Sequence, residues 1–277
     1  MEYHIIDVFT DKLFGGNPAG VCLLNSWPPD CVMQNIAAEN NLSETAFLVR
    51  QEKGSYNLRW FTPTLEIDLC GHATMASAYV LFDETERDAE ALRFKTMSGI
   101  LTVTKEGDML HLNLPSAPVA ECPVYPAIEK ALGVRPLEVY KSIDFLVLLD
   151  SEETLLKIAP DFALLKELKA EAKLDHNRFG VIITAPGSDC DFVSRYFAPN
   201  VGVNEDPATG RAHCSLTPFW SGRLGKKIMD AKQLSARGGV LRCEDCGERV
   251  KIGGNAVRYL RGNIQLDVHL FSPFFMK

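Results

Sequence analysis

An internal repeat is the feature that most constrains the fold of this 277-residue chain. Residues 56–63 read Tyr-x-x-Arg-Trp-Phe-x-Pro, and residues 192–199 read Phe-x-x-Arg-Tyr-Phe-x-Pro, an offset of 136. After a shift of three residues the match resumes at an offset of 139, with the pairs Glu66/Glu205, Gly71/Gly210 and Ala73/Ala212. Self-similarity at about half the chain length indicates a duplicated unit. We therefore predict two similar halves.

Each copy is predicted to hold an aromatic-rich strand, a turn, an acidic loop and a helix that begins at glycine. The whole chain is rich in alternating and β-branched segments, which predicts an α+β fold with many strands, the last at 263–271. Helices are predicted at 29–40, 71–82, 124–132, 160–172 and 210–222. The second and fifth are apolar on most faces, which is typical of buried helices.

These patterns predict a division into residues 1–117 and residues 118–277, each half a curled sheet around one central helix. The last strand of the chain could return to the first half. A length of 277 residues by itself allows one domain or two, so the division rests on the repeat.

Composition and charge exclude several classes of protein. A hydrophobic content of 46% is typical of a soluble globular protein, and a net charge of −7 argues against a nucleic-acid-binding surface. No run of 18 apolar residues indicates a membrane span, and the amino terminus does not resemble a secretory signal. We therefore expect a cytoplasmic protein.

The eight cysteines are mostly isolated in apolar settings, which favours buried free thiols. Cys243 and Cys246 form the one CxxC pair. A structural zinc site needs four ligands, and no second pair accompanies this one, so two cysteines in a turn are favoured over zinc or redox chemistry. No metal site is expected.

Gly71 and Gly210 begin the two central helices at matching positions. The free N–H groups and the dipole of a helix N-terminus attract carboxylate or phosphate groups. Two such ends would frame a cleft for a small anionic molecule. The alternative is that each glycine simply permits a tight turn.

Residues that break the repeat are the better candidates for chemistry. Glu44 stands before an apolar strand, and its counterpart is Gly180. Apolar surroundings disfavour the ionised form of a carboxyl group, which suits a general acid or base near neutral pH. A capping or solvated glutamate is the alternative.

The starts of the two central helices also differ. Cys70 and His72 could transfer protons, although a lone histidine is more often structural. Asp206 precedes the second helix and could act as its cap. Arg211 is the counterpart of His72 at the offset of 139, so both helices offer a cationic or ionisable side chain there.

Four motifs together resemble the PhzF family of phenazine-biosynthesis-like proteins. They are Gly-Asn-Pro-Ala-Gly-Val at 16–21, Ser-Glu-Thr-Ala-Phe at 43–47, Asp-Leu-Cys-Gly-His-Ala-Thr at 68–74, and Gly-Val-Asn-Glu-Asp-Pro-Ala-Thr-Gly at 202–210. The resemblance implies a diaminopimelate-epimerase-like fold with the active site between two halves, and a homodimer.

The resemblance further implies a biosynthetic isomerase that needs no cofactor or metal and moves a proton on a small carboxylate substrate. Glu44 takes the role of acid/base, with His72 and Asp206 as polar partners. The backbone at Gly71 and Gly210 would hold the carboxylate. The other substrate-binding residues implied by the matched motifs and their surroundings are Asn17, Cys70, Ala73, Arg211 and Ala212.

Two departures from related patterns leave alternatives open. The related epimerases use two cysteines, but the counterpart of Cys70 is Thr209, which disfavours a two-thiol mechanism and leaves a Cys70-dependent racemase as a weaker alternative. Arg211 stands where relatives of the family usually carry serine. This motivates the other alternative, a small-molecule-binding or interaction protein that has lost catalysis.

Overall fold

The computed structural model describes residues 1–174, 176 and 179–266, and the chain divides into two compact units. Unit 1 consists of residues 1–113 together with the chain from Gly253 onward, and unit 2 runs from Leu114 to Ile252. Among the described residues no helix is both long enough and apolar enough to span a bilayer. Each unit is an α+β structure.

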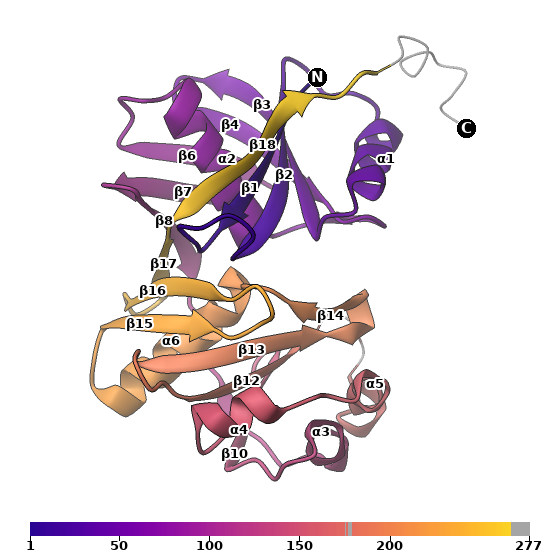
Figure 1. Cartoon of the computed structure of the whole chain (residues 1–277), viewed down its shortest axis with the longest axis vertical. Coiled ribbons are helices and arrows are strands. Elements are labelled where there is room, and N and C mark those ends of the chain that lie inside the picture. The colour runs from indigo at the N-terminus through magenta and orange to yellow at the C-terminus, as the bar shows by residue number, and fades with distance from the viewer. Residues whose placement is uncertain (175, 177–178, 267–277) are drawn as a thin grey trace. The chain divides into compact units, whose positions relative to one another are not determined.

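Unit 1 is built on a mixed sheet around one helix (Figure 1). Its last strand, β18, pairs antiparallel with β1, so the end of the described chain lies beside its beginning. The strands are β1 (Glu2–Val8), β2 (Asn17–Leu24), β3 (Glu44–Glu52), β4 (Ser55–Phe61), β5 (Glu66–Ile67), β6 (Ala91–Thr96), β7 (Gly99–Glu106), β8 (Met109–Pro115) and β18 (Ala256–Asn263). The helices are α1 (Asp30–Asn40) and the central α2 (Gly71–Glu84).

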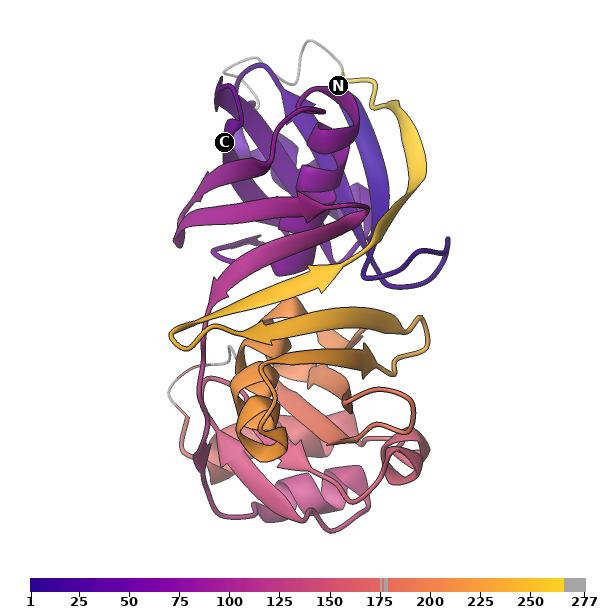
Figure 2. The same cartoon turned by 90° about the vertical axis from the view of Figure 1, so that its left-hand side faces the viewer.

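Unit 2 repeats this plan with additional short helices. Its strands are β9 (Ala120–Glu121), β10 (Glu138–Lys141), β11 (Phe145–Leu148), β12 (Val181–Pro186), β13 (Phe192–Ala198), β14 (Val203–Asp206), β15 (Ile228–Gln233), β16 (Gly239–Asp245) and β17 (Arg249–Gly254). Its α-helices are α3 (Pro126–Leu132), α4 (Glu152–Lys157), α5 (Phe162–Glu171) and the central α6 (Gly210–Leu224), which packs against β15 and β16 (Figure 2).

The strand pairings show the duplication directly. In unit 1, β2/β3 is parallel, β3/β4 and β4/β5 are antiparallel, β4/β6 is parallel and β6/β7 is antiparallel. In unit 2, the series β11/β12, β12/β13, β13/β14, β13/β15 and β15/β16 has the same order of directions. The predicted pair of pseudo-symmetric halves is confirmed.

The two central helices are buried because their sequences are apolar and rich in small residues. Helix α2 packs against β1, β2, β3, β7 and β18. The hydroxyl groups of Thr74 and Ser77 donate to the carbonyl groups of Cys70 and Ala73, one turn earlier, so these polar side chains are satisfied inside the core.

Helix α6 contains Pro218, which has no N–H to donate to the carbonyl of Cys214. That carbonyl instead accepts the backbone N–H of Ala117 at 3.0 Å. Ala117 lies between β8 and β9, so the segment that enters unit 2 is attached to its central helix at the point where the proline leaves an acceptor unused.

The repeated arginine and glutamate form the same ion pair in both units. Arg59 donates Nε and Nη2 to the two carboxylate oxygens of Glu66, both at 2.7 Å. Arg195 donates the same two groups to Glu205 at 2.7 and 3.1 Å. Two parallel hydrogen bonds from a guanidinium group hold the carboxylate in one orientation and compensate its charge. Each pair therefore holds the loop between an inner strand and the following central helix.

All five predicted helices are present, whereas α4 was not predicted. It is a short helix in which Ser151 caps the N–H of Thr154, and Glu152 and Glu153 occupy the first turn. This capping pattern was the signal available in the sequence. Of the strand predicted at 263–271, residues 264–266 are not in a strand and residues 267–271 lie outside the described chain.

We predict that Arg195→Gln lowers the free energy of unfolding of the protein by about 2–4 kcal/mol. The substitution leaves the half-buried carboxylate of Glu205 unpaired, together with the carbonyl groups of Leu155 and Ile158 that also accept from Arg195. Urea denaturation would measure the loss. The control is Arg242→Gln in an exposed ion pair, expected within about 0.5 kcal/mol of the parent; equal losses in both variants would contradict the prediction.

Candidate active site

Glu44 is the first residue of β3 and lies beside Ala19 of β2 in a parallel ladder. The five residues that follow it in the strand are buried and uncharged, so the strand is fixed in the core while the side chain of Glu44 lies at its beginning. The side chain of Glu44 is 16% exposed. A carboxylate in this setting is held firmly and remains accessible to a small molecule.

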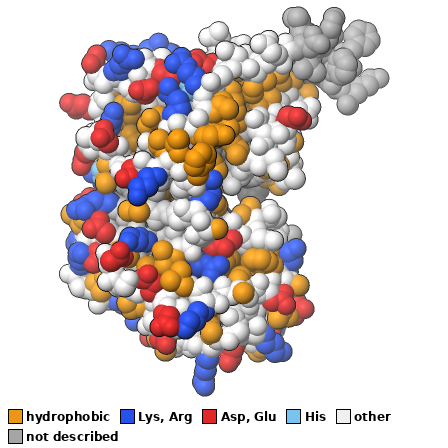
Figure 3. Space-filling model, viewed as in Figure 1, with side chains coloured by type: hydrophobic (Ala, Val, Ile, Leu, Met, Phe, Trp, Pro, Cys, Tyr) orange, Lys and Arg blue, Asp and Glu red, His pale blue; other side chains and the backbone are white. Residues whose placement is uncertain are grey.

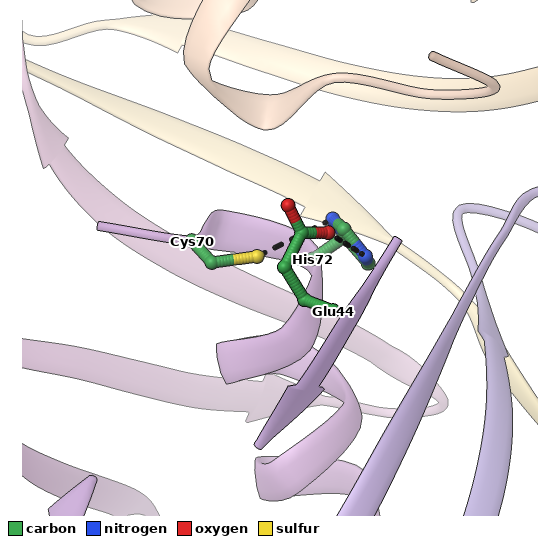
Figure 4. A group of neighbouring side chains, drawn as sticks. All are labelled: Glu44, Cys70 and His72. Atoms are coloured by element: carbon green, nitrogen blue, oxygen red, sulfur yellow. Dashed lines mark hydrogen bonds and ion pairs between the residues drawn. The ribbon is translucent and has the colours of Figure 1, made fainter. Parts of the chain in front are cut away.

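His72 lies in the first turn of α2 and is buried. Its Nε2 atom lies 3.3 Å from Oε2 of Glu44, and Figure 4 shows the two side chains facing each other. Burial disfavours the imidazolium form and lowers the pKa of His72 to about 4. The imidazole beside Glu44 is therefore neutral at physiological pH.

The other ring nitrogen of His72 determines which tautomer is present. Its Nδ1 atom lies 3.4 Å from the amide nitrogen of Asn17 and 3.5 Å from the sulfur of Cys70. Because an amide nitrogen only donates, Nδ1 accepts, and the single proton of the neutral ring is on Nε2. His72 thus directs an N–H toward the carboxylate of Glu44.

The N-terminus of α2 adds a second feature to this site. Cys70 occupies the N-cap position with an extended backbone, and its side chain makes no capping hydrogen bond within the described structure. Gly71 and Ala73 are both buried in the first turn. Their position fits the predicted role of this helix end in holding a carboxylate group.

The predicted residues of the second half lie in unit 2 and form a separate group. Asp206 ends β14, and its carboxylate accepts the hydroxyl group of Thr209, the N-cap of α6. Gly210 and Ala212 are buried in the first turn of α6. Arg211 is directed to Asp144, with 3.2 Å between Nη2 and Oδ1.

Two residues in unit 2 were missed by the sequence analysis. Buried Gln233, at the end of β15, accepts the N–H of Thr209 at 2.8 Å and donates to the carbonyl of Asp206 at 2.7 Å. It therefore fixes the loop before α6. Asp144, which faces Arg211, precedes β11. Neither residue belongs to a recognisable motif, so the sequence carried no local signal for them.

Two clusters in the described chain have suitable residues to hold a metal ion. Glu44, Cys70 and His72 have one potential ligand atom each, all within 4.8 Å of one another, and so do Glu2, His4 and Glu84. In the second cluster the carboxylates also pair with Arg258 and Arg261. Cys243 is buried in β16 and Cys246 is exposed beyond its end.

Comparison with known proteins identifies the class to which this fold and site belong. The family model for phenazine biosynthesis-like protein matches residues 6–262. A Pseudomonas aeruginosa protein named as an uncharacterized isomerase is 49% identical over 261 residues, which cover 94% of this chain and 97% of that protein. The chain therefore belongs to the phenazine biosynthesis-like, or PhzF, family.

Solved structures agree with this assignment. A PhzF family protein from Enterococcus faecalis is 48% identical, with a TM-score of 0.90 over 96% of this chain and 99% of that one. A probable proline racemase from Agrobacterium radiobacter has a TM-score of 0.66 at 12% identity, covering 99% of this chain and 94% of that one. The second comparison shows the fold alone, and it confirms the predicted epimerase-like architecture.

We predict that His72 stays neutral down to about pH 5, because burial opposes its protonation. Between pH 6.5 and pH 4 the unfolded chain, with an ordinary histidine pKa, binds more protons than the folded chain. The stability that depends on neutral His72 is therefore retained above pH 6.5 and falls with pH below it. The Cε1–H resonance in an NMR titration, assigned with His72→Gln, would measure this directly; a midpoint at or above pH 6.5 would disprove it.

Proposed function

We propose that this protein is a cofactor-independent isomerase that moves a proton on a small carboxylate substrate, with Glu44 as the acid and base. The observation that carries the proposal is the contact of 3.3 Å between Glu44 and the neutral ring of His72. The relative from Pseudomonas aeruginosa that is named as an isomerase supports the reaction class.

In this mechanism the carboxylate of Glu44 removes a proton from a carbon of the substrate, and the electron pair moves into the adjacent double bond. Glu44, now protonated, returns the proton to the carbon at the far end of the same three-carbon system. One carboxylate thus completes the shift, and no electrons are gained or lost. The reaction needs no redox cofactor.

His72 would assist as a neutral neighbour of the carboxylate and not by its charge. Its Nε2 atom lies 3.3 Å from Oε2 of Glu44, and Asn17 holds the ring, through Nδ1, in the tautomer that carries the proton on Nε2. A neutral partner, unlike a cation, adds no positive charge that would stabilise the ionised form of the carboxylate.

The carboxylate of the substrate would bind at the N-terminus of α2. The backbone N–H groups near Gly71 and the helix dipole favour an anion there, and Ala73 leaves space in the first turn. Binding an anion at this end would place the carbon beside its carboxylate close to Glu44. The roles of Asp206, Gly210, Arg211 and Ala212 in binding stay predictions.

We predict that Glu44→Gln lowers turnover by about 10²–10⁴-fold, because the amide cannot take up or return a proton. The measurement is NMR of a responsive substrate in D₂O, following both isomer formation and deuterium incorporation. The matched control is Glu39→Gln, an exposed glutamate on α1, which should retain parental rates. Equal turnover in the parent and Glu44→Gln would refute the mechanism.

Cys70→Ser in the same assay distinguishes the glutamate mechanism from a thiol mechanism. If Glu44 is the acid and base, this variant keeps turnover within about tenfold of the parent, since a serine can still donate to Nδ1 of His72. A loss as large as that of Glu44→Gln would favour proton transfer by Cys70.

We also propose that the protein forms a homodimer. Figure 3 shows hydrophobic side chains exposed on one face of unit 1. The rings of Phe14 and Tyr259, both in unit 1, are 66% and 52% exposed and lie 5.7 Å apart. Clustered exposed aromatic residues are typical of interfaces. We predict a dimer by sedimentation velocity and a shift toward monomer in Tyr259→Asp. A monomeric parent at micromolar concentration would contradict this.

A further inference from the structure

Three side chains of unit 1 with different metal-binding groups converge at the start of α2. Glu44 has a carboxylate, Cys70 a thiol and His72 an imidazole, and one potential ligand atom of each lies within 4.8 Å of the other two. Figure 4 shows these side chains together at the N-terminus of the helix. All three belong to unit 1, so their arrangement does not depend on the position of unit 2.

The distances within this cluster match those between neighbouring ligands of a zinc ion. Zinc bonds of about 2.0–2.1 Å to nitrogen or oxygen and about 2.3 Å to sulfur, at tetrahedral angles, place two ligands roughly 3.3–3.6 Å apart. Nε2 of His72 lies 3.3 Å from Oε2 of Glu44, and Nδ1 lies 3.5 Å from the sulfur of Cys70. Because a zinc ion binds one ring nitrogen, a rotation of the thiol toward Nε2 would complete the set.

The Nε2 atom of His72 is the ring nitrogen that suits a metal ion. It is buried, and within the described part of the chain it has no partner in hydrogen-bonding geometry. A buried polar atom without a partner is costly and points to a ligand, an ion or a water at that place. With zinc on Nε2 the ring proton moves to Nδ1, where the amide oxygen of Asn17 would accept it after a half-turn of the amide.

Cys70 determines which metal ion the cluster would prefer. It occupies the N-cap position of α2, and the positive end of a helix dipole stabilises a thiolate. Thiolate and imidazole ligands favour zinc, whereas magnesium and calcium prefer oxygen ligands. Binding would release the thiol proton to water and leave the imidazole neutral, with no change of oxidation state.

The second metal-binding cluster of unit 1 differs in its charges. Glu2, His4 and Glu84 also have ligand atoms within 4.8 Å of one another. However, Oε1 of Glu84 lies 2.9 Å from Nη2 of Arg258, and Oε1 of Glu2 lies 2.8 Å from Nη2 of Arg261. Two guanidinium groups oppose the entry of another cation, and this cluster contains no sulfur. It therefore serves as an internal comparison.

We infer that Glu44, Cys70 and His72 form a zinc site whose occupation excludes the substrate, so that zinc ions inhibit the protein. The side chain of Glu44 is 16% exposed, which leaves room for a water molecule as the fourth ligand. A bound zinc ion would occupy the carboxylate that transfers the proton. Zinc binding does not depend on the proposed function, whereas the inhibition rests on it.

Binding is tested on the full-length protein with the metal ions themselves. Competition with a chromophoric chelator should show one equivalent of Zn²⁺ bound with a dissociation constant of about 1 μM or lower. Co²⁺ in the same site should give a near-ultraviolet thiolate-to-cobalt absorption band, which requires a sulfur ligand. Cys70→Ser should abolish the band and weaken Zn²⁺ binding at least about tenfold. Absence of the band in the parent, or its persistence in Cys70→Ser, would overturn the inference.

Matched variants distinguish this site from the other candidates. Glu2→Gln removes a ligand of the second cluster, and Cys246→Ser removes the exposed sulfur of the CxxC pair. Both should keep the band and the parental affinity. Glu44→Gln and His72→Gln should each weaken Zn²⁺ binding at least about tenfold. Circular dichroism confirms that each variant is folded. Loss of binding only in Glu2→Gln or Cys246→Ser would place the metal elsewhere and disprove the site.

Turnover with added Zn²⁺ tests the inhibition. In the parent, Zn²⁺ should raise KM and leave kcat constant, and a chelator should restore the original rate. Cys70→Ser, compared with its own rate without metal, should need at least about tenfold more Zn²⁺ for half inhibition. One equivalent of bound Zn²⁺ with unchanged turnover would refute the inhibition. Full turnover in metal-free Glu44→Gln would instead refute the proposed function, and the absorption band would still decide whether the zinc site exists.

Discussion

The bidentate ion pair between an inner strand and the loop before the central helix is the interaction on which both units depend. Arg59 with Glu66, and Arg195 with Glu205, each join a strand of the sheet to the loop that leads to a helix N-terminus. A helix end can act on a ligand only if its backbone N–H groups keep a fixed direction. Each copy of the ion pair holds the loop before one central helix. The side chains that differ between the two copies are carried by this shared backbone arrangement.

Burial determines what the residues at each helix start can do. The same position holds a neutral imidazole in unit 1 and a permanently charged guanidinium in unit 2. Desolvation keeps the imidazole of His72 neutral beside the carboxylate of Glu44. The partly exposed Arg211 keeps its charge, and with two other donors it compensates the burial of the carboxylate of Asp144. The same helix position therefore carries a neutral side chain in unit 1 and a positively charged one in unit 2.

Much of the architecture could be predicted from the sequence, because the repeat, the glycine-led helices and the apolar composition of α2 and α6 are local patterns. Glu44 and His72 could be identified because they differ between the two copies of the repeat and lie in recognisable motifs. Their contact could not be predicted, because it depends on the pairing of β3 with its neighbours and on the packing of α2. Asp144 and Gln233 were missed for the same reason. Their importance comes from strand register, which places a residue beside a partner 67 or 24 positions away.

The proline in α6 has a consequence for how the two copies diverged. At the offset of 139 its counterpart in α2 is Tyr79, so only the second copy leaves a helical carbonyl without its usual donor. The chain segment at Ala117 uses that carbonyl, and a helix with an ordinary residue at this position would withdraw it. A second copy with the sequence of the first would therefore lose this attachment of the connecting segment. In this respect the two central helices are not interchangeable.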